Sequence, residues 1–356
     1  MFPREYRGVA FAVALFVLVQ LGALALVPSF AESGYQPVDD PQDPVNSLIY
    51  IVAIIVMTGF MLAAFRYELD WAIRLLIVGV SGWLSWYVFS AILPPLVAAL
   101  PALAVAVGLL VHPEWYIIDS AGVLMGAGAA GLFGITFGIL PALILLVFLA
   151  IYDAISVYGT EHMLTLAEGV MDLNIPVVLV IPTTLSYSLL EDDFSGAADV
   201  HEGDEEGEEG EPIDGNEGET ADGNTEESTD GDEDHGAADG DEDETADGDD
   251  PDEDPSRDAF FIGLGDAVIP AVLVASAATF SPAPALSVPV IGLNLPALLA
   301  MVGVVAGLLV LMSWVMKGRA HAGLPLLNGG AIGGYLIGSL LAGVPLIEAV
   351  GLGPFV

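Results

Sequence analysis

The sequence lacks cysteine and has very few basic residues. There is no Cys, and one Lys with six Arg supply all the fixed positive charge of 356 residues. The absence of Cys excludes disulfides, thiol catalysis and Cys-ligated metals. The five His form no His-Glu-x-x-His pair or other metal-ligand spacing, so a zinc protease is not expected. Because no phosphate loop or dinucleotide motif follows a strand either, we expect no cofactor, no metal and no nucleic-acid partner.

What the sequence has in excess is apolar residues. Hydrophobic residues make up 54% of the chain, which is more than a soluble domain of this size can bury in one core. Apolar runs of about 18 or more residues are long enough to cross a bilayer as helices. They predict an all-α polytopic membrane protein with about nine transmembrane helices. The expected spans are residues 8–28, 47–65, 71–90, 93–111, 118–136, 138–158, 259–280, 289–315 and 322–344.

The negative charge is concentrated in one segment between the sixth and seventh expected spans. Of the 48 acids, 33 lie between Glu191 and Asp258, where the only base is Arg257. Such a stretch cannot bury enough apolar surface to offset chain entropy, which predicts a disordered loop. A solvating role, as in an organism with high internal salt, is favoured over the binding of calcium or of a partner. The expected organisation is helices one to six in 1–158, a cytoplasmic loop in 159–258 and helices seven to nine in 259–356.

The basic residues orient the spans. With nine spans and a cytoplasmic N-terminus, every basic residue lies on or beside a cytoplasmic segment, as the positive-inside rule requires. These residues are Arg4, Arg7, Arg66, Arg74, Arg257, Lys317 and Arg319. Merging the fifth and sixth spans would break this agreement, and residues for a tight turn between them are present at Gly131, Gly134, Gly138 and Pro141. We therefore expect a multi-pass protein of the cell membrane with a cytoplasmic acidic loop, and a first span that is retained rather than cleaved as a signal peptide.

Two aspartates lie inside expected spans, where an ionisable group is costly and marks a functional site by default. Asp153 is in the sixth span and Asp266 in the seventh, whereas most acids outside the loop, Asp119 among them, lie in loops or near helix ends. Asp153 comes about five residues before the cytoplasmic end of its span, and Asp266 about seven residues after the start of its own, so both lie roughly 8–10 Å deep. If the two helices are neighbours, the carboxylates face each other.

Two carboxylates that meet in an apolar site share a proton and titrate as a pair. One then acts as the base that activates water and the other as the acid that protonates the leaving group, as in aspartic proteases. The residues before Asp266 read Gly263-Leu264-Gly265, and we expect the two glycines to let another backbone approach the acid. Asp153 and Asp266 are therefore the candidate catalytic residues.

These residues resemble the motifs of the presenilin and signal peptide peptidase family of intramembrane aspartyl proteases. Tyr152-Asp153 is similar to the family's Tyr-Asp motif, and Gly263-Leu264-Gly265-Asp266 is similar to its Gly-x-Gly-Asp motif. The third motif, Pro-Ala-Leu, opens the ninth span, and the matching place here reads Pro325-Leu326-Leu327, with Leu in place of Ala. The resemblance runs from about residue 118 to 345 and extends to the span count and the long loop. The acidic loop and the lack of Cys favour an archaeal member.

The resemblance implies an aspartic endopeptidase of the Gly-x-Gly-Asp type that cuts within the transmembrane segments of single-span membrane proteins. It also implies a water-accessible cavity around the two Asp, supported by Tyr152, Gly263, Leu264, Gly265, Pro325, Leu326 and Leu327. The expected partners are transmembrane-helix substrates and the lipid bilayer, with no obligatory protein partner. Presenilin-type members have a cytoplasmic N-terminus, which matches the topology here and implies substrates whose N-terminus lies outside.

The apolar segment 173–190 is broken by Pro176 and Pro182, and as a tenth span it would upset the charge pattern. We expect a short strand or re-entrant segment there, near the cytoplasmic face. The resemblance suggests that such a segment pairs with an unwound substrate by strand addition, and packing alone is the other interpretation.

A secondary transporter that binds a proton or a cation at Asp153 and Asp266 is the main alternative function. Against it, the two halves of the chain show no repeat, and both acids lie in the C-terminal part. A prepilin-type peptidase also uses Gly-x-Gly-Asp, but Tyr152 and the Pro-x-Leu run favour the presenilin group. The presence of both carboxylates argues against a catalytically silent scaffold.

Overall fold

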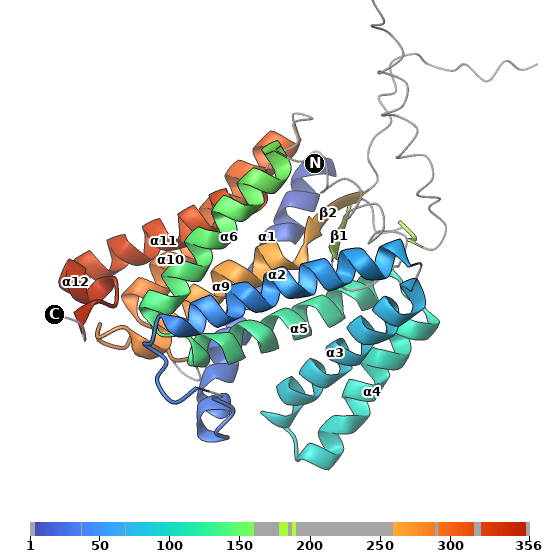
Figure 1. Ribbon diagram of the computed structural model, residues 1–356, viewed down its shortest axis with the longest axis horizontal. Helices are drawn as coiled ribbons and strands as arrows, with labels where there is room; N and C mark the ends of the chain where they lie inside the picture. The colour runs from blue at the N-terminus through green and yellow to red at the C-terminus, as the bar shows by residue number, and fades with distance from the viewer. Residues whose placement is uncertain are drawn as a thin grey trace, which may run out of the picture. The chain divides into compact units, whose positions relative to one another are not determined.

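Helices account for most of the computed structural model (Figure 1). The structure describes residues 4–36, 38–67, 69–159, 178–183, 187–189, 259–288, 291–316 and 322–353. The long helices within these residues are α1 (Arg4–Glu32), α2 (Val45–Arg66), α3 (Asp70–Ser90), α4 (Pro95–Val111), α5 (Trp115–Thr136), α6 (Ile139–Gly159), α9 (Leu264–Phe280), α10 (Leu295–Val315) and α11 (Gly323–Leu341). The other described elements are the short helix α12 (Leu346–Ala349) and the strands β1 (Val178–Pro182) and β2 (Ala259–Gly263).

The long helices are those of a polytopic membrane protein. Seven of the described helices are long and apolar enough to cross a membrane, and α4 and α9, of 17 residues each, are shorter apolar helices. A helix satisfies its own backbone hydrogen bonds, as a segment in hydrocarbon must because lipid offers no partners. The prediction of an all-α polytopic membrane protein is confirmed, and each expected span contains one long helix. The cytoplasmic location of the N-terminus stays a prediction.

The seventh expected span begins as a strand and not as a helix. β2 occupies its first five residues, Ala259–Gly263, and α9 starts at the next residue, Leu264. β2 pairs antiparallel with β1, with Val180 opposite Phe261. The aromatic and β-branched residues of Ala-Phe-Phe-Ile-Gly favour an extended strand over a helix when a partner strand is available.

That partner strand lies in the apolar segment 173–190. β1 has the sequence Val-Leu-Val-Ile-Pro, whose β-branched residues favour a strand and whose proline opposes a helix. The expected short strand is confirmed, whereas strand addition by a substrate stays a prediction. The acidic stretch 191–258 lies outside the described residues.

The chain reverses between α5 and α6 at Gly138. The N–H of Gly138 donates to the carbonyl oxygen of Pro41 at 2.7 Å, in the loop between α1 and α2. Of the other residues expected in this turn, Gly131 and Gly134 lie inside α5, and Pro141 is the third residue of α6. A methyl group on Gly134 would overlap Ala275 of α9. The two earlier glycines therefore serve helix packing rather than the turn.

α5 and α9 lie at the centre of the helix packing, and α2 lies at its edge. α9 contacts α1, α5, α6, α10 and α11, and its residues 271–275 are at most 2% exposed. α2 contacts chiefly α6 and α3, and most of its apolar side chains are exposed. In a membrane these exposed side chains face lipid, which is as apolar as they are.

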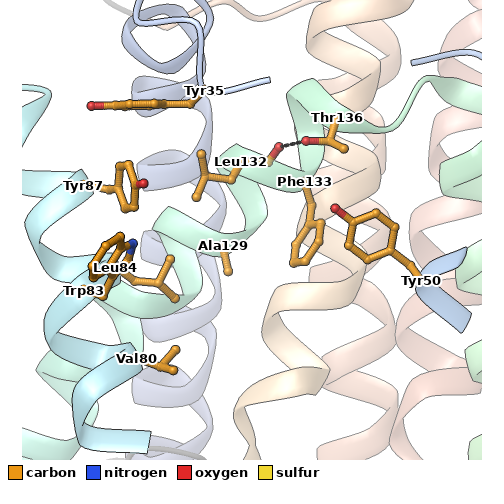
Figure 2. Close-up of a pocket in the computed structure, with 10 residues that line it drawn as sticks. All are labelled: Tyr35, Tyr50, Val80, Trp83, Leu84, Tyr87, Ala129, Leu132, Phe133 and Thr136. Atoms are coloured by element: carbon orange, nitrogen blue, oxygen red, sulfur yellow. Dashed lines mark hydrogen bonds between the residues drawn. The ribbon is translucent and has the colours of Figure 1, made fainter. Parts of the chain in front are cut away.

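A cavity of about 480 Å³ lies between α2, α3 and α5, and Figure 2 shows its aromatic walls. Tyr50 of α2 packs edge-on against Phe133 of α5, with ring centres 5.3 Å apart. Tyr35, in the loop after α1, packs edge-on against Tyr87 of α3 at 4.7 Å. Tyr50 is the one α2 residue in the cavity lining, which otherwise comes from α3, α5 and Tyr35.

α10 and α11 touch through their backbones. Glycines recur every four residues on the two facing sides, at Gly303, Gly307, Gly330, Gly334 and Gly338. A methyl group on Gly330 would overlap the carbonyl oxygen of Gly303, and one on Gly307 would lie 2.6 Å from the carbonyl oxygen of Leu326. Small residues allow this approach in membranes, where helices associate by close packing. These glycines, which we call the glycine seam, thus fix the position of α11 along the axis of α10.

Gly330→Ala is expected to lower the free energy of unfolding by about 1–3 kcal/mol, because the added methyl group meets the backbone of Gly303. Gly333→Ala on the same helix is the matched control, since a methyl group there has no described atom within 4 Å. Titration with SDS in detergent micelles, followed by tryptophan fluorescence, measures both variants. Equal stability of the two variants would contradict the backbone seam.

Candidate active site

Asp153 lies near the end of α6 and contacts the first turn of α11. Its side chain is 8% exposed, and its Oδ2 accepts a hydrogen bond from the N–H of Leu324 at 3.1 Å. Leu324 is the second residue of α11, so its N–H has no partner within the helix. The carboxylate of Asp153 takes the place of a capping side chain, which Ala322 at the N-cap does not provide.

Asp266 is the third residue of α9 and is half-buried. Its carboxylate lies beside Gly323, the first residue of α11. A methyl group on Gly323 would be 2.9 Å from Oδ2 of Asp266 and 3.3 Å from its Cγ. Any side chain at position 323 would therefore press on the carboxylate.

The start of α11 brings the two aspartates together. Asp153 meets Leu324 and Asp266 meets the adjoining Gly323, so both carboxylates lie at the first two residues of α11. The three helices that carry these residues, α6, α9 and α11, contact one another in every pair. The N-termini of α9 and α11 carry partial positive charge, which favours a negative charge beside them. The arrangement suits one ionised carboxylate and one protonated carboxyl group in an apolar setting.

Pro325, Leu326 and Leu327 continue the first turn of α11. A proline fits at this position because the N–H that it lacks would have no partner within the helix. The carbonyl oxygen of Leu326 lies 2.6 Å from where a methyl group on Gly307 of α10 would be, and Leu327 is fully buried. The turn anchors α11 next to the aspartates. Because the contact at Leu326 is made by its backbone, it does not depend on whether the side chain is Leu or Ala.

Among the described residues, no backbone atom lies within 4 Å of where a methyl group on either glycine before Asp266 would be. A methyl group on Gly265 would have only the end of Ile269 near it among the described atoms, at 3.9 Å. One on Gly263 would meet only the carboxylate of Asp266, at 3.7 Å. That these glycines admit another backbone stays a prediction, whereas within the described residues a close approach to Asp266 is made at Gly323.

The residues next to the aspartates, Tyr152 in α6 and Leu264 in α9, differ in exposure. Tyr152 is 43% exposed and stacks on Phe148 of the same helix, with ring centres 6.3 Å apart, so its ring lies on an exposed side of α6. Leu264 is 6% exposed and packs towards Gly126 of α5. Leu264 is therefore part of the packing that holds α9, whereas Tyr152 projects away from that packing.

Sequence reasoning missed three residues that the structure brings to or near the site. Gly323 gave no signal, since the chain has 41 glycines. Asn328 is fully buried, and its Nδ2 donates to the carbonyl oxygen of Leu146 at 2.9 Å, which ties α11 to α6 two turns before Asp153. A lone amide in an apolar span was the available signal for it. Asp119 lies near the start of α5, as expected, but its side chain is only 3% exposed, which the sequence did not indicate.

The chain matches a family model described as signal-peptide peptidase, presenilin aspartyl protease, over residues 13–344. No curated protein matches the chain. Among the solved structures similar to it are two that are described as a presenilin family intramembrane aspartate protease. The structure in space group C222 is 28% identical, with 94% of this chain and 99% of that one covered and a TM-score of 0.57. The structure in space group P2 is 29% identical, with 92% and 96% covered and a TM-score of 0.51.

Proposed function

The chain belongs to the signal-peptide peptidase and presenilin aspartyl protease family, and we propose that Asp153 and Asp266 are the catalytic pair of this intramembrane aspartyl protease. The observation that carries the proposal is the meeting of both carboxylates at the first two residues of α11. One is held by the N–H of Leu324 at 3.1 Å, and the other lies against Gly323.

The pair hydrolyses a peptide bond by dividing proton transfer between its two members. The ionised carboxylate removes a proton from a water molecule as the water oxygen attacks the peptide carbonyl carbon. The protonated carboxyl group donates its proton as the C–N bond breaks, so that the products are a carboxylic acid and an amine. The N–H of Leu324 favours the ionised form of the carboxylate that accepts it, so we assign the base to Asp153 and the acid to Asp266.

The proposed substrates are single-span membrane proteins with their N-terminus outside. A protease whose acids lie within membrane-spanning helices reaches peptide bonds at the same depth, inside the apolar segment of a substrate. The orientation follows from the expected cytoplasmic N-terminus of this chain. Asp153 and Asp266 have different surroundings and different assigned roles. In a substrate running in the opposite direction, the peptide nitrogen would face the base and the carbonyl group would face the acid, which does not suit the reaction.

Asp153→Asn and Asp266→Asn are each expected to slow cleavage by about 10²- to 10⁴-fold or more, since Asn keeps an acceptor oxygen but transfers no proton. The assay follows a labelled single-span substrate in proteoliposomes at high salt, with product masses that locate the cut. Glu348→Gln changes an exposed acid in α12 and is the control. Cleavage by either Asn variant at the wild-type rate would sink the assignment.

Gly323→Ala is expected to lower kcat by about tenfold or more, because its methyl group displaces the Asp266 carboxylate from the position it shares with α11. Gly329→Ala, where a methyl group has no described atom within 4 Å, should cleave at the wild-type rate. The same substrate assay measures kcat, and SDS unfolding in parallel shows whether a lower kcat comes from a loss of stability. Wild-type turnover of Gly323→Ala would show that the close contact with Asp266 is not needed.

A substrate reconstituted with its N-terminus outside is expected to be cut, whereas the same segment in the inverted orientation is expected to resist cleavage. The two orientations are compared in liposomes after protease protection has established which end of each substrate is exposed. Equal cleavage of both would count against the proposed substrate class.

A further inference from the structure

One buried acid takes no part in the proposed chemistry. Asp119 lies on the second turn of α5, and its side chain is 3% exposed. Its Oδ1 accepts a hydrogen bond from the N–H of Val180 in β1 at 2.8 Å. Its Oδ2 makes no hydrogen bond within the described residues. An acid that is buried for a single backbone contact carries a desolvation cost, which points to a role for that contact.

The bond from Asp119 satisfies a strand N–H that the β-ribbon leaves unpaired. Val180 lies opposite Phe261 of β2, yet its N–H points to α5 and not across the ribbon. In an antiparallel pair such outward N–H groups belong to the non-hydrogen-bonded positions. Val180 is 2% exposed, so water does not replace the carboxylate as its partner. Asp119 therefore fastens β1 to α5 at the middle of the strand.

The position of β1 is transmitted to Asp266 through β2. β2 pairs with β1 along five residues and ends at Gly263, and α9 begins at Leu264 with no linker between them. Asp266 is only three residues beyond the strand. A shift of β1 along α5 would therefore move β2, and with it the start of α9 and its carboxylate.

The side of α5 that carries Asp119 packs against both β1 and the start of α9. Gly122 lies one turn after Asp119, and a methyl group on it would be 3.0 Å from Leu179 of β1 and 3.7 Å from Leu264 of α9. These apolar contacts hold the ribbon against α5, but dispersion contacts are not directional. The hydrogen bond to Asp119 supplies the directional element.

The N-cap and first residue of α5, Glu114 and Trp115, also hold the segment that follows β1. Glu114 accepts hydrogen bonds from the Oγ of Ser188 at 2.6 Å and from the N–H of Leu189 at 3.1 Å. The indole N–H of Trp115 donates to the carbonyl oxygen of Tyr187 at 3.0 Å. Burial raises the pKa of Glu114, but its hydrogen bonds outweigh burial and leave the pKa below its ordinary value. Glu114 and Trp115 thus secure the segment after the strand, and Asp119 secures the strand itself.

We propose that Asp119 is a positioning residue for the active site, which holds β1 through the N–H of Val180 and thereby sets where Asp266 meets the start of α11. The proposal rests on the proposed function, in which Asp266 is one of the two catalytic acids. What Asp119 contributes is an acceptor oxygen at one point on α5, and not a charge or a proton for the reaction.

The test compares variants that keep a hydrogen-bond acceptor at position 119 with variants that lack one. Asp119→Leu keeps the branching at Cγ but has no acceptor, Asp119→Ala removes the acceptor without adding bulk, and Asp119→Asn retains the oxygen that Val180 needs. Ser120→Ala is the matched control, because Ser120 is the next residue on α5 and is exposed, and within the described residues its side chain bonds to the carbonyl oxygen of Tyr116 in the same helix. All four variants are made in the full chain and reconstituted with the labelled single-span substrate.

Asp119→Leu and Asp119→Ala are expected to lower kcat by about 10- to 100-fold with KM unchanged, because the reacting groups are misplaced while the substrate still binds. Asp119→Asn should restore most of the wild-type kcat. Hydrogen exchange followed by mass spectrometry provides a readout that does not require cleavage. Peptides containing Val180 should exchange faster in the Leu and Ala variants, and at the wild-type rate in the Asn and Ser120→Ala variants.

Wild-type kcat in Asp119→Leu or Asp119→Ala would overturn the proposal, and so would unchanged exchange at Val180 in these variants. A loss of kcat in Asp119→Asn as large as that in Asp119→Leu would also overturn it, since the acceptor oxygen would then not be what matters. If neither the wild type nor Ser120→Ala cleaves any substrate, the proposed function fails. The exchange at Val180 then still decides whether Asp119 holds the strand.

Discussion

A charged group within a bilayer must find its polar partners in the protein, because lipid supplies none. For Asp153 that partner is the N–H of Leu324, which is available because it belongs to the first turn of a helix. Asp266 also lies in the first turn of a helix. An Arg or Lys beside the pair would hold both carboxylates ionised, whereas a neutral N–H leaves one proton to be shared. The use of helix ends instead of basic side chains thus keeps the pair suited to acid–base chemistry.

This arrangement requires the start of α11 to come very close to the carboxylates, and glycine makes that possible. Gly323 leaves room for Asp266, and further along α11 the seam with Gly303 and Gly307 fixes how the helix sits against α10. Asn328 ties the same helix to α6. The residues that position the site are therefore mostly ones without side chains, or ones whose backbone makes the contact, as at Leu326. Packing of this kind is the main source of helix association where both helix surface and solvent are apolar.

Several features of the chain were predicted because they depend on local sequence. The nine expected spans follow from apolar runs, and the strand β1 follows from two prolines that flank a β-branched run. The start of the seventh span was predicted as helix but is β2, because an apolar run of Phe and Ile suits either state and the presence of β1 decided between them. Gly131 and Gly134 were predicted in a turn but lie in α5, since glycine serves turns and close helix packing alike.

The sequence alone determined that this chain is a polytopic membrane protein and singled out Asp153 and Asp266 as acids within expected spans, because hydropathy and the cost of a charge in lipid are read along a single segment. Only the tertiary structure decided what those acids meet. The bond from Leu324 to Asp153 joins residues 171 positions apart, and the bond from Val180 to Asp119 joins residues 61 positions apart. Such contacts depend on how closely distant helices approach, and that distance is set by packing across the whole bundle rather than by any local pattern.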